Sequence, residues 1–286
     1  MAYNAGSDPT LAEHITSKFV PEIFSKEVLL TAKPNLVCTS RFDTHWLENL
    51  RKGYKVSIPA MTGASCTEVT PGTEPTAADL RGTAVAITVD KWQESSAEIS
   101  EMIGIEMLAD YYAAAAEECG VAIAKAVDLD VSSLFSTLAA SSVYGSDGQT
   151  FDDAIFQALV QYLDEQDVPD DGLRSLIGDP STRLDIYNVD KFIRTDYVRE
   201  ASVPTGKIGQ LYNCGVFITN NLTASTTGNY GVLAHKKAIG VAIQKEPRTR
   251  YFDLGYKFIN KVIVDCIWGA DEVRDTFGKS FYTRSK

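Results

Sequence analysis

The sequence has few of the residues that build metal and redox sites. Its 286 residues include five cysteines, which are odd in number, far apart and nowhere separated by only two residues. This pattern argues against a zinc site and against a disulfide framework. We therefore expect free thiols in a reducing compartment at every cysteine position: Cys38, Cys66, Cys119, Cys214 and Cys266.

Long apolar runs are also missing. No stretch approaches the ~20 apolar residues that span a bilayer, so we expect no membrane-spanning segment. The first residues lack the basic region followed by an apolar region that marks a secretory signal, so no signal peptide is expected.

Positive charge is scarce in the middle of the chain. The net charge is −11, and residues 61–200 carry eight basic against 26 acidic side chains, whereas residues 201–286 carry twelve against six. The middle of the chain would therefore repel nucleic acid, and no basic stripe with interleaved aromatic residues offsets this repulsion. Sequence-specific binding of DNA or RNA is not expected.

No constellation of catalytic residues is present. His14, His45 and His235 have neither metal-ligand nor triad spacing, and we interpret them as surface or loop residues. The glycine-bearing stretch 226–231 lacks the Lys-Ser/Thr ending of a phosphate loop and is expected to be a surface loop. We predict no catalytic residue, no cofactor and no metal ligand, and hence a protein that is not an enzyme.

Two acidic stretches are candidates for a cation site. Asp128 and Asp130 are one residue apart, so their carboxylates could converge on a divalent ion, although a solvated helix end is the simpler interpretation. The acidic run 164–171 is expected to be a solvated loop, with a calcium site or an exposed rim as the alternatives.

The sequence does contain both strand and helix patterns, which predict an α+β fold. Residues 54–59 and 83–92 alternate as strands on either side of a long loop rich in threonine, glycine, proline and alanine, and they should pair as a hairpin. A hairpin alone is marginal in water, so we expect this one to contact another subunit.

A long helix is expected directly after the hairpin. Residues 95–98 match a capping box, and apolar residues recur every four positions from Ile99 to Cys119, which predicts a helix over about 97–127. At 1.5 Å per residue, ~30 residues would span about 45 Å, which suits an extended subunit better than a compact domain. Gly104 and Gly120 should weaken the helix interior.

Shorter elements occupy the rest of the chain. Thr150 is the expected cap of one helix, and residues 235–244 form a mostly apolar run. The helices are expected over 21–30, 150–166 and 184–193. The strands are expected over 175–180, 215–219 and 261–269. Three tryptophans are interpreted as buried anchors: Trp46, Trp92 and Trp268.

Four stretches, in the same order along the chain, resemble sequence segments that recur in one family, the Hong Kong 97-type major capsid proteins of tailed phages. The resemblance covers nearly the whole chain. It is carried by residues 52–59 closed by 90–92, residues 177–180 followed by a helix with Tyr187 and Phe192, residues 205–222, and residues 235–244 closed by 268–274.

The resemblance implies the family's division of the chain. An N-terminal arm (1–50) would precede an extended hairpin called the E-loop (51–95) and the spine helix of a peripheral domain (96–145). An axial domain (146–240) would follow, and return strands of the peripheral domain (241–286) would complete the chain. Trp92 would then lie at the base of the hairpin and Trp268 in the peripheral domain.

The resemblance also implies a function. The subunit would assemble as pentamers and hexamers, in the host cytoplasm, into the icosahedral head that encloses phage double-stranded DNA, without sequence-specific contact to it. The implied partners are further copies of the chain, a portal protein and, in some phages, a decoration protein. Some family members carry a long scaffolding extension before the hairpin. Only about 50 residues precede it here, so we expect a separate scaffolding protein.

Two further family properties bear on this chain. Some members weld their subunits through a Lys–Asn isopeptide bond that uses an E-loop lysine. No lysine lies between Val56 and Asp90, so this crosslink is not expected. Maturation in the family flattens the shell and bends the spine helix, for which Gly104 and Gly120 are the candidate soft points.

Two alternative functions stay open at this point. An encapsulin-type bacterial compartment shares the fold but packages enzymes instead of DNA. A cytosolic enzyme of unknown chemistry would be a compact particle rather than a shell subunit.

Overall fold

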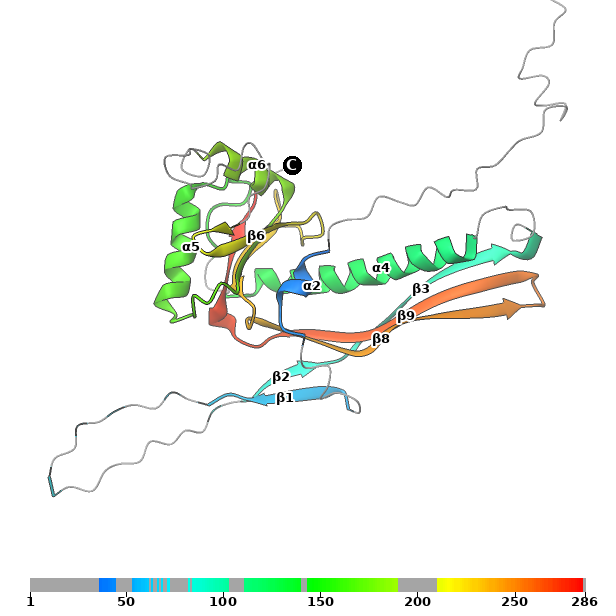
Figure 1. The fold of residues 1–286 in the computed structure, drawn as a ribbon, viewed down its shortest axis with the longest axis horizontal. Coiled ribbons are helices and arrows are strands. Elements are labelled where there is room, and N and C mark those ends of the chain that lie inside the picture. The colour runs from blue at the N-terminus through cyan, green and yellow to red at the C-terminus, as the bar shows by residue number, and fades with distance from the viewer. Residues whose placement is uncertain are drawn as a thin grey trace, which may run out of the picture.

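The chain folds into a compact part, a long arm and a separate hairpin (Figure 1). The computed structural model describes residues 36–44, 53–61, 84–102, 111–139, 143–189 and 210–284, with isolated positions between 63 and 82. No helix among these residues is long and apolar enough to cross a membrane.

The compact part is built on a five-stranded sheet in the order β10-β7-β4-β6-β5. The central strand β4 is buried at every residue and pairs parallel to β6 and antiparallel to β7. The strands are β4 (Arg174–Gly178), β5 (Gln210–Leu211), β6 (Cys214–Ile218), β7 (Tyr230–His235) and β10 (Gly278–Tyr282). The predicted strands over 175–180 and 215–219 are therefore confirmed within a residue or two.

Helix α5 (Asp153–Glu165) packs on this sheet with the predicted apolar stripe. Ile155, Leu159 and Leu163 are buried in the main core. The predicted cap, Thr150, is wrong: Asp152 has the extended backbone of a cap residue, and its side chain accepts a hydrogen bond from the Ile155 N–H at 2.9 Å.

Helix α6 (Pro180–Asn188) begins four residues before the predicted start at residue 184. The Asp179 side chain accepts a hydrogen bond from the Thr182 N–H at 2.9 Å, and Pro180 occupies the first helical turn. Proline suits this position because its missing N–H would have no partner there.

The arm consists of a three-stranded antiparallel sheet and one helix. Strands β3 (Lys91–Ser100), β9 (Ile259–Glu272) and β8 (Ile239–Leu254) lie in that order, with β9 central. Helix α4 (Tyr111–Ser133) runs along the sheet (Figure 1). Its buried stripe packs on β9 through Cys119, Ile123 and Val127 against Val264, Cys266 and Trp268.

The prediction that a helix starts near residue 97 is wrong. Residues 95–100 belong to β3 and pair one to one with β9, from Ser95 opposite Val264 to Ser100 opposite Ile259. Ladder hydrogen bonds and burial of Ile99 outweigh the local capping signal, because strand pairing depends on distant residues. The helix also ends six residues later than predicted, at Ser133.

Strands β1 (Lys55–Pro59) and β2 (Ala84–Thr88) form the predicted antiparallel hairpin, with Lys55 opposite Thr88. The second strand is shorter than predicted, because Lys91 already begins β3 in the other sheet. Trp92 was expected to be a buried anchor, but 70% of its surface is exposed. Trp268 is fully buried, as predicted.

Residues near both ends of the described chain pack on other elements of the fold. Strand β10 pairs with β7 in the compact part, so it does not join the three-stranded sheet of β8 and β9. The short helix α2 (Cys38–Arg41) lies on α4, and Asp43 forms a parallel bridge with Gly240. Two single turns, η2 (Leu134–Ser136) and η3 (Asp275–Phe277), complete the elements.

Several predictions fall outside the described residues. They concern His14, His45, Trp46, Gly104 and Phe192, together with residues 21–30, 103–110 and 205–209.

Candidate assembly surfaces

His235 is the one histidine that lies within the described residues, and it is not the surface or loop residue that was predicted. Its side chain is fully buried at the end of β7. Nδ1 accepts the Lys237 backbone N–H at 3.2 Å, so Nε2 carries the proton toward Asp171 Oδ1, also at 3.2 Å. The ring meets Phe277 edge-on. Both ring nitrogens of His235 are therefore engaged in contacts that hold this part of the fold together.

The carboxylates of Asp128 and Asp130 do not converge. Two residues along a helix are turned by about 200°, so the side chains leave α4 on opposite sides. Asp130 accepts hydrogen bonds from the Lys91 ammonium of β3 and, at 3.1 Å, from the Trp268 indole N–H of β9. Within the described residues, no group of three or more His, Cys, Asp or Glu side chains could hold a metal ion.

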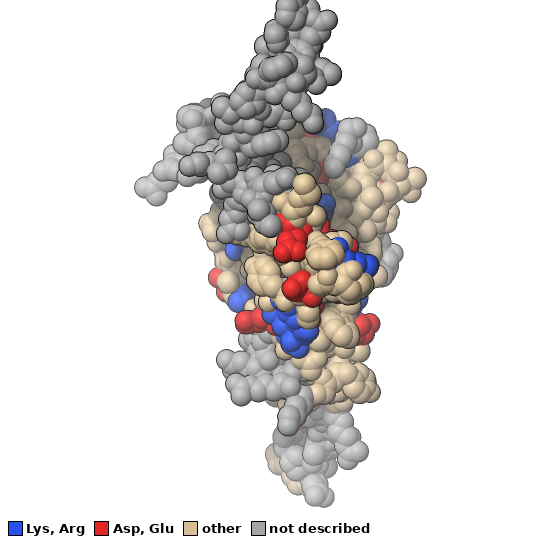
Figure 2. Space-filling model, turned by 90° about the vertical axis from the view of Figure 1, so that its right-hand side faces the viewer, with Lys and Arg blue, Asp and Glu red and all other residues tan. Residues whose placement is uncertain are grey.

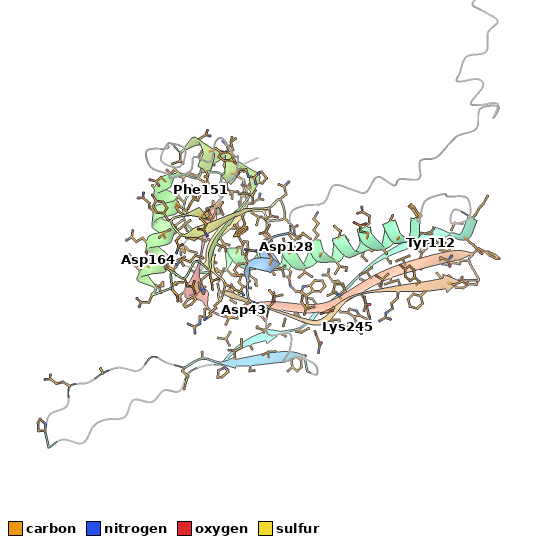
Figure 3. The ribbon with its side chains drawn as sticks, in the orientation of Figure 1. Asp43, Tyr112, Asp128, Phe151, Asp164 and Lys245 are labelled. Atoms are coloured by element: carbon orange, nitrogen blue, oxygen red, sulfur yellow. The ribbon has the colours of Figure 1, made fainter. Side chains whose placement is uncertain are left out.

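Asp128 is buried, which corrects its interpretation as part of a solvated helix end. Its Oδ1 accepts the Thr39 backbone N–H at 2.8 Å and the Thr39 hydroxyl at 3.1 Å, and its Oδ2 accepts the Asn221 amide at 3.4 Å. Burial, followed by the charge of Asp128, raises the pKa of the neighbouring Cys38 thiol far above its usual value. Asp128 therefore ties the N-terminal segment, α4 and the compact part together (Figure 3).

The acidic run 164–171 begins in the last turn of α5 and continues from residue 166 as the predicted solvated loop, with Val168 buried inside it. Asp164 pairs with the buried guanidinium of Arg174 at 2.7 Å, and Asp170 accepts the Asn213 amide at 2.8 Å. In the stretch 226–231, Thr226 and Thr227 are exposed, whereas Gly231 already belongs to β7.

All five cysteines are free thiols, as predicted, and Cys66 is the exposed one. Burial raises the pKa of Cys214 to about 11 and raises that of Cys266 as well. These thiols are poor nucleophiles at neutral pH, since the thiolate is the reactive form.

The hairpin packs on β8 and β9 through Ile87, which is fully buried beside Ala242, but it also exposes apolar groups. Tyr54 and Met61, at its two ends, are 71% and 78% exposed. A groove of about 710 Å³ lies between one end of the hairpin and the compact part and is lined by Ile58, Val85 and Phe277 among others. Exposed apolar groups that border a groove mark a contact surface.

The far end of the β8–β9 hairpin carries a cluster of exposed aromatic side chains. Tyr251, Phe252, Tyr256 and Phe258 are 62%, 43%, 77% and 71% exposed, far more than a solvated turn requires. Figure 2 looks onto this end and shows acidic and basic groups in small separate patches among uncharged ones. This cluster was not predicted, although aromatic residues on both sides of Gly255 are visible in the sequence.

Comparison with models of known families gives no match, and neither does comparison with curated proteins. Solved structures do match. A chain from Mycobacterium phage Che8 is 17% identical, with a TM-score of 0.79 over 92% of this chain and 97% of that one. The capsid structure of cyanophage P-SCSP1u gives 15% identity and a TM-score of 0.76 over 94% of each chain.

The mature capsid of bacteriophage PhiM1 gives 13% identity and a TM-score of 0.71 over 92% of both chains. The chain therefore has the α+β fold of phage capsid proteins, as the resemblance implied.

Proposed function

We propose that the chain is the major capsid protein of a tailed phage, the repeating subunit of its icosahedral head. The observation that carries the proposal is the end-to-end match to phage capsid structures, with 94% of both chains covered in the cyanophage comparison. The long arm, the projecting hairpin and the exposed aromatic cluster support it, because they leave apolar surface uncovered within one subunit.

Pentamers and hexamers form around the axial domain, residues 146–240 together with β10. The arm joins neighbouring capsomers, and the hairpin lies across an adjacent subunit. Each contact contributes little by itself, but a shell multiplies it over many copies, so the assembled state is far more stable than one interface would suggest.

The acidic middle of the chain suits a wall that holds DNA without binding it, since a motor at the portal drives the packaging. The remaining partners of this role are a portal protein, a separate scaffolding protein and, in some heads, a decoration protein. Assembly takes place in the host cytoplasm. If this chain expressed alone gave only correctly sized shells, the scaffolding proposal would fail.

The direct test is expression of the chain followed by size-exclusion chromatography and negative-stain microscopy. Megadalton shells or rings of capsomers are expected. A compact monomer or dimer that never polymerises would refute the proposal and would favour the enzyme alternative. An encapsulin-type compartment is distinguished by its neighbouring gene, a cargo enzyme in place of portal and terminase genes.

The shell is held together without covalent welds, because the E-loop carries no lysine between Val56 and Asp90. Boiled mature particles should give monomer bands on a denaturing gel, and a covalent ladder would contradict this.

Gly120 lies inside α4, and an added Cβ there would meet no atom within 4 Å. Alanine therefore fits, and loss of shell expansion in Gly120→Ala would identify this position as the flexible point of the spine.

A further inference from the structure

Strand β3 forms an outer edge of the three-stranded sheet, whose order is β3-β9-β8. It pairs with β9 without a register shift up to Ser100 opposite Ile259. The next residue, Glu101, donates its backbone N–H to the Phe258 carbonyl at 3.1 Å and so continues this register as a hydrogen-bonded pair. Such pairs alternate along an antiparallel ladder, so every second residue of β3 directs its N–H and C=O away from β9. These outward residues are Trp92, Glu94, Ser96, Glu98 and Ser100.

The outward backbone groups of β3 are open to solvent. Within the part of the chain that the structure describes, no strand lies beyond β3, and no other backbone group bonds to the five outward residues. Four of the five are exposed, and Ser100 is half-buried. Since backbone N–H and C=O groups are obligatory hydrogen-bonding groups, a row of them along a sheet edge is a template for one more strand.

The opposite edge of the same sheet, formed by β8, is closed to such pairing. Asp43 forms a bridge with Gly240 near the start of β8. Farther along, the register of β8 shifts twice between Ile243 and Arg248, and Pro247 has no N–H to offer. Bulges and prolines keep edge strands from pairing with other chains. Strand β3 has neither a shift nor a proline over its ten residues, so its edge alone can accept a long strand.

The edge of β3 is also acidic. The outward residues alternate with those that face α4, so their side chains lie on the uncovered side of the sheet. Glu94 and Glu98 are both exposed there, and four residues at ~3.3 Å each separate them by about 13 Å. The Glu98 carboxylate lies 3.6 Å from Lys261, whereas the nearby Arg248 is paired with Asp265. A strand laid along this edge would therefore meet two carboxylates.

A second copy of β3 is a poor occupant of this edge. The antiparallel register that pairs all five outward residues places Glu94 of each copy opposite Glu98 of the other. Like charges directly opposite each other on one face of a sheet are destabilising. The same two carboxylates would stabilise a strand that carries basic side chains at the matching positions.

We propose that the outer edge of β3 binds an extended, basic segment of a partner protein, which adds a fourth strand to the sheet. The backbone of the partner bonds the outward N–H and C=O groups, and its basic side chains, four positions apart, lie opposite Glu94 and Glu98. The inference goes beyond the shell function, because it concerns a partner other than this chain. Exposed ion pairs are screened, so binding weakens as the salt concentration rises.

The probe is a synthetic peptide of about nine residues in which threonine and valine alternate, with lysine in place of two threonines four positions apart. The matched control peptide has glutamate at these two positions. Fluorescence anisotropy with the full-length, unassembled subunit should show saturable binding of the lysine peptide and several-fold weaker binding of the glutamate peptide. Glu94→Gln combined with Glu98→Gln should lower the affinity for the lysine peptide several-fold and remove most of the difference between the two peptides.

Ser96→Pro tests the backbone part of the contact. The Ser96 N–H points away from β9, so proline removes a donor of the open edge and no bond of the β3–β9 ladder. This variant should bind the lysine peptide about tenfold more weakly or worse, the loss expected for about one hydrogen bond. Ser96→Ala keeps the N–H and should bind like the parent. If Ser96→Pro does not fold, the neutralised pair decides together with hydrogen exchange in the parent, where bound peptide should slow the amides of Glu94, Ser96 and Glu98.

Three results would overturn the inference: no saturable binding of the lysine peptide by the parent, equal affinity for the two peptides, or equal binding by folded Ser96→Pro. Protection of the three amides in shells made from this chain alone would also overturn it, because a second copy would then fill the edge. If the chain forms no shells, the proposed function fails, but the peptide measurements use the unassembled subunit and still decide whether the edge of β3 binds a basic strand.

Discussion

The compact part and the arm differ in how completely they bury their large side chains. In the compact part even a lysine is buried: Lys279 is 1% exposed, donates to the Ala139 carbonyl at 3.0 Å and lies over the rings of Tyr144 and Tyr162. In the arm, α4 covers one face of the sheet, while the other exposes Trp92 and Phe252. The compact part thus buries its core within one subunit, whereas the arm leaves large aromatic side chains uncovered.

This difference separates folding from assembly within a single chain. Substitutions in the core of the compact part should lower the free energy of unfolding of the subunit itself. Substitutions on the face of the three-stranded sheet that α4 leaves uncovered should leave that free energy nearly unchanged and, under the proposed function, lower the yield of shells. Four variants, from the largest expected effect on unfolding to the smallest, test whether the division is real.

Phe281→Ala should have the largest effect. The ring is fully buried, lies 4.9 Å from the Phe151 ring between centroids and covers Gly231, where a Cβ would come within 2.3 Å of it. Losing such a side chain costs about 3–5 kcal/mol, a large share of a domain's stability. Urea denaturation of the unassembled subunit measures the loss. A cost below about 1 kcal/mol would show that the compact part is not a complete core.

Asp128→Ala tests the junction between the two regions. The change leaves the Thr39 N–H and hydroxyl and the Asn221 amide without their buried acceptor, which should cost about 2–3 kcal/mol. Thr39→Val is the matched control, because it removes only the hydroxyl's bond and should cost about 1 kcal/mol. Equal costs for both variants would contradict a role of Asp128 in tying three segments together.

Asp265→Asn should cost about 1 kcal/mol, since the guanidinium of Arg248 is partly exposed and the pair is screened. The Arg248 hydrogen bonds hold the pKa of Asp265 below its usual value of 3.8. A carboxyl with a lowered pKa in the folded state stabilises the protein above its unfolded pKa and loses this contribution as the pH falls through the folded value.

Acid denaturation measures this difference for Asp265. Between neutral pH and pH 3.8, the variant should be less stable than the parent, and the two curves should converge at lower pH. Asp253→Asn, at an exposed position of β8, serves as the control and should follow the parent. Curves that stay parallel through the acid range would rule out the expected linkage.

Trp92→Ala should change the free energy of unfolding least, by about 0.5 kcal/mol or less, as is usual for an exposed side chain. The yield of assembled particles, measured by sedimentation, should nevertheless fall several-fold. A subunit destabilised by more than about 1 kcal/mol with normal assembly would mean that Trp92 belongs to the fold and not to a contact.

The sequence was sufficient for elements whose pattern is local. The stripe of Ile155, Leu159 and Leu163, the alternation of the hairpin and the apolar run of β9 each depend on spacing within one segment, and each was predicted correctly. The order of the family-like stretches pointed to the capsid fold that the solved structures share.

The incorrect predictions concern residues whose structure is determined by contacts with distant parts of the chain. The capping box at residues 95–98 is a valid local signal, but β9 pairs with these residues from more than 150 positions away. Asp128 and His235 are polar residues whose burial depends on partners in other segments, namely Thr39, Asn221 and Asp171. No spacing rule connects such pairs, so their burial and partners were not predictable from a single sequence.

The position of β10 has a consequence for the timing of synthesis. Residues 278–282 form the edge strand beside β7, and Phe281 fills a core that includes Phe151, which is synthesised more than a hundred positions earlier. A nascent chain therefore carries an open sheet edge and an unfilled core until translation has passed Tyr282.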